Sequence, residues 1–239
     1  EDAIDVVELD QDGSVPELKV VNKSEVMILI LDGEELVGAR QNRIVNTTIL
    51  IAGKDTVVIP VSCVEQGRWS YDTERFHSEK RIMAPMMRAM KTQQVNYSVR
   101  LSGNFRSNQS AIWDEISAKA SRREAESDSM AMAEIYKKEK LAIDDYLENF
   151  AMVDSQIGAI FLINGKVVGM DCFGKSGTFE KTFKKIIESY ALDAIDWYDS
   201  KVDSKKLKTQ VNNFLKTAND TQVEMHPSVG LGIDCRLDS

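Results

Sequence analysis

The segment Ile28–Trp69 constrains the fold of this chain more than any other, because strongly apolar runs alternate there with short polar turns. Its first run, Met27–Leu31, is apolar and is followed by Asp32-Gly33, a strong signal for a two-residue turn. We therefore expect Glu34–Val37 to run back beside Met27–Leu31 as the second strand of a β-hairpin.

A second hairpin is predicted directly afterwards. Asn46–Ala52 is rich in Ile and Thr, and the turn Gly53-Lys54-Asp55 separates it from Thr56–Val61. The almost unbroken apolar character of Thr56–Val61 is typical of a strand that is buried on both faces.

Two polar strips flank the second hairpin, Gly38–Arg43 before it and Cys63–Trp69 after it. Strips that bracket one hairpin can converge in space, and we expect these two to meet. One interpretation is an open pocket. The other is a structural network in which arginine side chains clamp carboxylates and loop carbonyls. Both predict Arg–Glu pairing, because charges are costly to bury unpaired. The pocket would be lined by Glu34, Gln41, Arg43, Glu65 and Arg68.

Composition excludes several classes of protein. The 239 residues carry a net charge of −8, which argues against a general binder of nucleic acid or anionic membranes. No apolar run approaches ~18 residues, so we expect no membrane span. Three widely spaced cysteines and two histidines predict reduced thiols, a cytoplasmic location and no transition-metal site. Because the chain starts at Glu1 rather than Met, we expect the natural protein to begin earlier.

Outside this segment, the N-terminal part contains further strand signals. Ala3–Leu9, Leu18–Val21 and Val95–Leu101 are predicted strands, whereas Tyr71–Lys80 is polar and resembles a loop. Four methionines between Met83 and Met90 recur at helical spacing, and we interpret them as core-facing rather than as a binding surface.

The second half of the chain is predicted to be helical with one hairpin. A helix begins near Ser107 or Asn108, and an amphipathic helix covers Met132–Phe150. Asn164-Gly165 is the strongest hairpin signal in the chain and joins strands within residues 157–172. The clearest helix follows at Phe179–Ala194, with Lys181, Lys184 and Lys185 facing away from its apolar stripe. Beyond it we expect a helix capped at Asp203-Ser204, a short strand at Thr221–Met225 and an irregular tail from His226.

One segment matches a nucleotide-binding motif by letters alone. Gly169–Ser176 satisfies the P-loop pattern G-x-x-x-x-G-K-S/T. A P-loop opens a parallel βαβ unit, however, and the strand before Gly169 is the second arm of a tight hairpin. We therefore interpret the segment as a hairpin that leads into a helix, with Lys175 in solvent.

Several blocks together resemble the ARG and Rhodanese-Phosphatase-superfamily-associated protein domain family. The resemblance implies neighbours among ADP-ribosylglycohydrolases and rhodanese-like phosphatases, and a link to nucleotide, ADP-ribose or RNA-repair processing, but no particular reaction. Members of that family extend further at both ends, so an edge strand is expected outside this chain. The matching blocks are Leu31–Glu35, Gly38–Arg43, Ile59–Trp69, Asn108–Glu115, Ile163–Gly169 and Glu188–Ala194.

We therefore expect an α+β protein. Its β-rich N-terminal half, residues 1–106, forms a sandwich or partial barrel. The second half, residues 107–239, adds helices and the hairpin 157–172. No linker-like stretch divides the chain, so we expect one domain over residues 1–239.

Three functions remain open from the sequence. The first is a binding module for a nucleotide or ADP-ribose-like ligand, whose phosphates and base the polar strips would hold. The second is a hydrolase or transferase in which Glu34 or Glu65 acts as general acid or base and Arg68 stabilises developing charge. The third is an interaction scaffold without a small-molecule site. In the first, phosphates would bind Arg40, Arg43 and Arg68, polar edges would bind Gln41 and Asn42, and a base would stack on Trp69.

Overall fold

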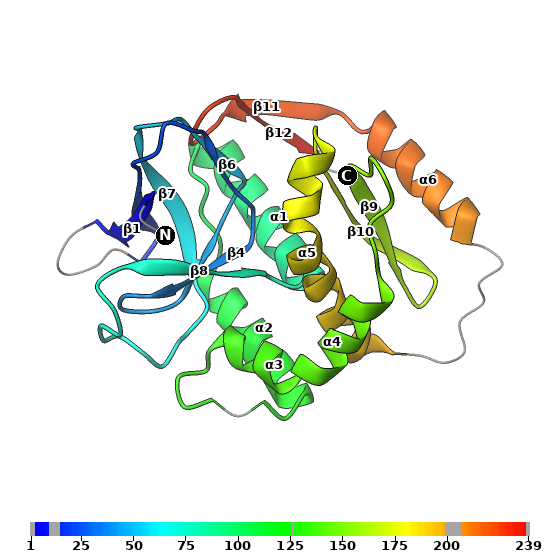
Figure 1. The fold of residues 1–239 in the computed structure, drawn as a ribbon, viewed down its shortest axis with the longest axis horizontal. Helices are drawn as coiled ribbons and strands as arrows, with labels where there is room; N and C mark the ends of the chain where they lie inside the picture. The colour runs from blue at the N-terminus through cyan, green and yellow to red at the C-terminus, as the bar shows by residue number, and fades with distance from the viewer. Residues whose placement is uncertain (1–2, 10–14, 126, 199–206, 238–239) are drawn as a thin grey trace.

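The computed structural model describes residues 3–9, 15–125, 127–198 and 207–237. The chain is α+β, as the sequence predicts. A β-barrel lies at one end, a layer of helices lies in the middle, and a β-hairpin (residues 158–172) and a last helix lie at the other end (Figure 1). A second β-hairpin (residues 223–237) runs along one edge of the helical layer towards the barrel (Figure 1). That these parts form a single domain stays a prediction.

Six antiparallel strands close the barrel in the order β1-β2-β7-β5-β4-β8. The sequence did not distinguish a sandwich from a partial barrel. In the structure, Val6 of the first strand pairs with Phe76 of the last, and this pairing closes the barrel. Inward-facing side chains such as Leu18, Val20 and Ile59 fill the barrel. The six strands are β1 (Ile4–Glu8), β2 (Glu17–Asn22), β4 (Glu34–Gly38), β5 (Arg43–Val45), β7 (Thr56–Cys63) and β8 (Phe76–Ile82).

Both hairpins predicted for the segment 28–69 are wrong, because their strands pair with other strands. β3 (Ile28–Ile30) pairs with β6 (Ile49–Ile51) instead of β4, while β4 pairs with β5 and β8. The turn at Gly33 does form, with Gly33 at φ 77°. A turn fixes a local change of direction but not the neighbouring strand. Pairing β3 with β6 buries Ile30, Ile49 and Ile51 in the same cluster as the barrel core.

The helices differ from the sequence prediction in two places. Residues 95–101 lie inside α1 rather than in a strand, and the predicted helix 132–150 is broken at Glu139. Asn108 is the N-cap of α2, as predicted, and its side chain accepts a hydrogen bond from the Ala111 N–H. The helices are α1 (Pro85–Ser102), α2 (Gln109–Arg122), α3 (Met132–Lys138), α4 (Lys140–Asn149), α5 (Ser176–Trp197) and α6 (Leu207–Asp220).

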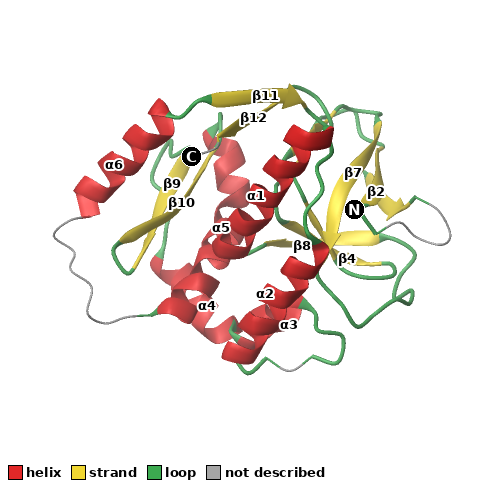
Figure 2. Cartoon of the chain, turned by 180° about the vertical axis from the view of Figure 1, so that it is seen from behind, coloured by secondary structure: helices red, strands yellow, loops and turns green. Residues whose placement is uncertain are grey.

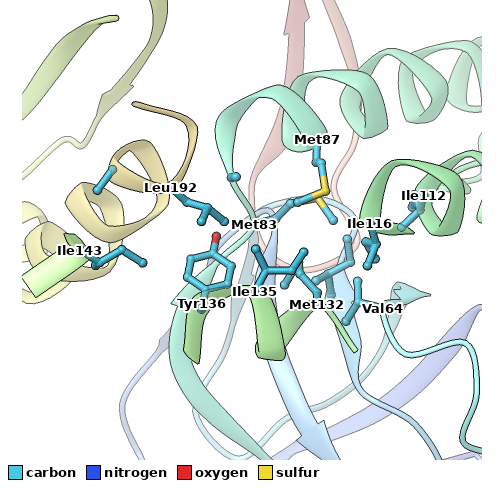
Figure 3. Packing of buried hydrophobic residues seen from close by; sticks show 13 residues of the cluster. Val64, Met83, Met87, Ile112, Ile116, Met132, Ile135, Tyr136, Ile143 and Leu192 are labelled. Carbon is cyan, nitrogen blue, oxygen red and sulfur yellow. The ribbon is translucent and has the colours of Figure 1, made fainter. Parts of the chain in front are cut away.

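A buried cluster joins the barrel to the helical layer. Met83 and Met87 pack there against Ile135 and Tyr136, which confirms that these methionines face the core (Figure 3). An ionic contact adds to this packing, because Asp193 of α5 accepts hydrogen bonds from the Met86 N–H of α1 and from Lys119 of α2. The first turn of α1, which has no capping side chain of its own, is thereby capped from another helix.

The predicted Asn-Gly hairpin is confirmed as β9 (Gly158–Ile163) and β10 (Lys166–Cys172). Asn164 and Gly165 have φ of 49° and 75°, as a type I′ turn requires. The hairpin packs on α5, where the Phe161 and Tyr190 rings stack. Since β10 belongs to a two-stranded antiparallel sheet and Lys175 is exposed, the segment lacks the parallel βαβ setting of a P-loop.

The C-terminal tail is a second hairpin rather than irregular. β11 (Val223–Pro227) pairs with β12 (Ile233–Leu237) along one edge of the helical layer (Figure 2). The predicted cap at residues 203–204 lies outside the described residues. Among the described helices, none combines the length and the apolar character that crossing a bilayer requires.

Candidate functional site

The two polar strips of the barrel meet, as the sequence predicts. Residues 38–43 and 63–69 together are called the belt here. The Asn42 N–H donates to Glu65 Oε2 at 3.1 Å, and Arg68 donates to the same carboxylate at 2.7 and 3.0 Å. Arg68 also reaches the Asn42 side-chain oxygen at 3.0 Å. The two segments are therefore joined directly through one carboxylate and one guanidinium group.

Most polar groups of the belt satisfy one another, although Nε and Nη2 of the buried Arg43 have no hydrogen-bond partner among the described residues. Arg68 also donates to the carbonyls of Ala39 and Ser70, and Arg43 donates to both oxygens of Gln41. Arg43 is completely buried, and an ion pair with Glu8 at 3.6 Å compensates its charge. Gln41, Asn42, Arg43 and Glu65 are thus covered and engaged, the arrangement expected of a structural network.

The electrostatics of Glu65 agree with this arrangement. Burial alone would raise the pKa of its carboxyl, but hydrogen bonds from Arg68, Ser129 and the Asn42 backbone outweigh burial. The pKa of Glu65 therefore lies below its usual value of 4.5. A carboxylate with these partners is stabilised in its charged form and is poorly suited to act as a proton donor.

Three of the predicted ligand-binding residues reach the surface. Arg68 is 18% exposed, and Trp69 is 45% exposed. The Arg40 guanidinium lies over the Tyr71 ring at 4.6 Å and over the Trp69 ring at 5.6 Å. At the outer edge of the belt, an arginine thus lies over two aromatic rings.

Glu34 is separated from the belt. It accepts hydrogen bonds from Ser78 at 2.9 Å and pairs with Lys185 at 3.1 Å. It stands at the start of β4, about 13 Å along the strand from the belt residue Gly38. Since Glu34 pairs with Lys185 and Glu65 pairs with Arg68, the fold does not join these two carboxylates into one acid–base device.

A different part of the molecule contains an accessible site. Two adjoining cavities of about 570 and 510 Å³ lie between α1, the β3–β6 pair, β10 and β12. We call them together the charged cleft. Residues that line both cavities mark the junction between them: Leu29, Asp32, Thr48, Thr92, Asn96 and Leu237.

Asp32 and Lys91 form an ion pair at this junction. Lys91 is completely buried, and its ammonium group contacts Asp32 Oδ1 and, at 3.0 Å, the Asn46 carbonyl oxygen. Burial lowers the pKa of Lys91, and the adjacent Asp32 carboxylate opposes this effect. The Asp32 side chain is 25% exposed, and its second oxygen accepts from Thr92 Oγ1 at 3.3 Å. The lysine is therefore hidden, while the carboxylate that it orients is open to the cleft.

Two further ion pairs line the walls of the cleft. Arg88 holds Asp171 through two parallel hydrogen bonds of 2.8 and 2.9 Å. Burial lowers the pKa of Arg88, but Asp171 outweighs this effect and raises it overall. On the other side, Arg236 pairs with Asp234 at 2.7 Å and donates to the Asn96 side chain at 2.6 Å. Each cation of the cleft is thus matched by one carboxylate.

Only part of this site has a signal in the sequence. Arg88, Thr92 and Asn96 are spaced by four residues and share a face of α1, so a polar stripe was visible. It was missed because residues 95–101 were predicted as a strand. Asp171 and Arg236 come from hairpins far along the chain, and no local pattern connects them to α1.

The described residues contain no group of three or more His, Cys, Asp or Glu side chains placed to hold a metal ion.

Fold and site together define an α+β protein in which a closed antiparallel barrel is joined to a helical layer with an open, charged cleft. The chain belongs to the family described as ARG and Rhodanese-Phosphatase-superfamily-associated Protein domain, whose model matches residues 1–239. This match confirms the resemblance inferred from the sequence blocks. Comparison with curated proteins and with solved structures found no match.

Proposed function

We propose that this chain is a binding module that holds a ribose-bearing ligand, such as a nucleotide or an ADP-ribose-like molecule, in the charged cleft. The observation that carries the proposal is the Asp32–Lys91 pair. Its lysine is completely buried, whereas its carboxylate is 25% exposed at the junction of the two cavities.

The cost of burying Lys91 supports a role beyond stability. Taking an ammonium group out of water costs several kcal/mol, and an apolar side chain of similar size often serves stability equally well. What a buried lysine adds is a fixed orientation for the carboxylate in front of it. Buried charges arranged in this way in a cleft are frequent at functional sites.

The chemistry of the cleft favours hydroxyl groups over phosphates. Carboxylate oxygens accept hydrogen bonds, and an acidic side chain that binds ribose hydroxyls is a recurring device of nucleotide recognition. The cations Arg88, Lys91 and Arg236 already face Asp171, Asp32 and Asp234. Phosphate oxygens would have to displace these carboxylates. The nucleoside part of the ligand therefore enters the cleft, and its phosphates remain near the mouth.

The size of the cleft is compatible with this ligand class. Each cavity lies within the range of about 300–1,000 Å³ that is usual for small-molecule sites. Phe173 lines the larger one and offers aromatic surface to a base. The family description names an association with ARG, which the sequence resemblance connects with ADP-ribosylglycohydrolases, and this is consistent with a ligand of this class.

Isothermal titration calorimetry with adenosine, AMP and ADP-ribose tests the proposal. All three ligands are expected to bind, with affinities within about tenfold of one another, because the phosphates contribute little. The variant Asp32→Asn keeps the shape of the side chain and should weaken binding at least tenfold. Thr48→Arg should block the cleft from an exposed position while leaving the buried ion pair in place.

Glu65→Gln is the matched control, because it removes one carboxylate charge from the belt. We expect it to bind like the wild type, with the fold of each variant verified by circular dichroism. Loss of binding in Glu65→Gln with retention in Asp32→Asn and Thr48→Arg would move the site to the belt. Absence of binding by all three ligands would refute the ligand class.

A further inference from the structure

A second cleft, separate from the charged cleft, carries an excess of lysine. It has a volume of about 760 Å³ and lies between β8, residues 152–155 and the first half of α5. Four lysines and only two carboxylates, Asp154 and Glu180, line it. We call it the lysine cleft. Its lysines are Lys80, Lys181, Lys184 and Lys185.

Most of these lysines have no direct ion-pair partner, and the lining keeps an excess of positive charge. Lys185 pairs with Glu34 at 3.1 Å. Within the part of the chain that the structure describes, Lys80, Lys181 and Lys184 have no carboxylate within ion-pair distance. The whole chain, by contrast, carries a net charge of −8. A local concentration of unpaired ammonium groups in an acidic protein attracts anions to this position.

The backbone brings these lysines together from two elements. Lys181, Lys184 and Lys185 are three and four residues apart on α5 and therefore share one face of the helix. Lys80 comes from β8 at φ 57°, a left-handed conformation that is uncommon outside glycine. The register between β8 and β4 shifts next to it, and such irregularities in a ladder re-aim side chains.

The floor of the cleft is apolar. Met152 and Phe183 line it and pack from below against the buried cluster that contains Phe179. Val153 adds an exposed apolar surface at the rim. Lysine stems also present methylene groups while the ammonium groups stay in water. The cleft thus combines an apolar base with a cationic rim.

We infer that the lysine cleft binds a small organic anion whose phosphate or carboxylate group meets Lys80, Lys181 and Lys184 while an apolar body covers Met152 and Phe183. Neither feature alone defines this ligand, because inorganic phosphate would leave the floor exposed and a neutral apolar molecule would leave the ammonium groups unpaired. The site shares no lining residue with the charged cleft, so the inference stands independently of the ribose-bearing ligand.

Phenylphosphonate and phenylacetate are suitable anionic probes, and benzyl alcohol is the neutral counterpart. Titration followed by calorimetry should detect at least one of the two anions in 20 mM salt and no binding of benzyl alcohol. Binding should weaken at least tenfold in 1 M salt, where the screening length falls to about 3 Å. The anion that binds more tightly identifies the head group.

A pair of double variants locates the site. Lys181→Glu with Lys184→Glu should weaken binding of the anion at least tenfold, and the milder Lys181→Gln with Lys184→Gln should weaken it in the same direction. The control Lys138→Glu with Lys216→Glu makes the same change in net charge at exposed positions outside the cleft and should stay within twofold of the wild type. All variants should retain their adenosine affinity.

Three results would overturn the inference: neither anion binds, benzyl alcohol binds as tightly as the anions, or the lysine-cleft variants and the control variants lose the same affinity.

Discussion

The belt and the charged cleft contain the same kinds of groups but differ in access. Both are built from arginine or lysine paired with carboxylates, and both use backbone carbonyls as further acceptors. In the belt, Glu65 is 5% exposed, and its partners Arg68 and Asn42 belong to the same closed network. In the cleft, the cation is buried but its partner Asp32 remains open. An ion pair thus closes a structure when its carboxylate is covered, as Glu65 is, and leaves a site when its carboxylate is accessible, as Asp32 is.

The largest expected effect comes from breaking the belt. Glu65→Ala leaves the Arg68 guanidinium and the Asn42 N–H without their acceptor. Removing one partner of a buried ion pair costs about 3–5 kcal/mol, and the partial exposure of Arg68 argues for about 3 kcal/mol here. Urea denaturation measures the change in the free energy of unfolding. Glu74→Ala, at an exposed neighbouring position, should change it by no more than about 0.5 kcal/mol, and equal losses in both would contradict the network.

Acid should reproduce part of this effect without a mutation. Because the pKa of Glu65 is depressed in the folded state, its stabilising contribution is present above its ordinary value of 4.5 and is lost as the pH falls through the lower, folded-state pKa. We expect the urea midpoint of the wild type to fall between pH 5 and pH 3. Glu65→Gln cannot titrate at this position, so its midpoint should fall less over the same range. Parallel curves would show that Glu65 contributes nothing to the acid sensitivity.

Lys91→Met tests whether the cleft lysine serves binding more than stability. Methionine fills a similar volume without a charge, and the Asp32 that remains is accessible to water. We expect a stability change of no more than about 1 kcal/mol. Adenosine affinity should fall at least tenfold, because the carboxylate loses the group that orients it. Unaltered affinity, or a loss of stability as large as that of Glu65→Ala, would remove the distinction between cleft and belt.

Trp69→Ala should have the smallest effect. The ring is 45% exposed, and the guanidinium groups of Arg40 and Arg43 lie over it at 5.6 and 5.7 Å, so its loss should cost about 0.5–1 kcal/mol. Ligand affinity should remain unchanged, since Trp69 lies in the belt. Trp69→Phe retains a ring and should recover most of the stability. Intrinsic differential scanning fluorimetry is unsuitable here because the variants remove a fluorophore, so calorimetric melting is the measurement.

The convergence of the belt was predictable because its two strips lie close together in the sequence, at either end of one apolar segment. Its internal pairing also followed from residue type, since neither a guanidinium group nor a carboxylate is buried unpaired at low cost. Its closure to solvent was not predictable. Whether Arg43 faces a ligand or Glu8 depends on β1, a strand more than thirty residues earlier in the chain.

The charged cleft could not be predicted as a unit. The Asp32-Gly33 turn was recognised, but it was assigned to a hairpin that does not form. Lys91 directly follows a run of core-facing methionines, and nothing in that pattern indicates a buried charge. Asp171 lies in the segment Gly169–Ser176, which we interpreted only as the end of a hairpin. The groups that matter most for ligand access come from four distant parts of the chain, so no periodicity or spacing links them.

By itself, the sequence determined the class of fold, the positions of most strands and turns, and the membership of a family. Apolar periodicity, turn residues and block similarity are properties of short segments, and they do not depend on how the chain is packed. Only the tertiary structure decided which strands are neighbours, that the barrel is closed, and which charged groups remain in contact with water. Those outcomes depend on which surfaces are buried together, and burial is a property of the packed whole rather than of any segment.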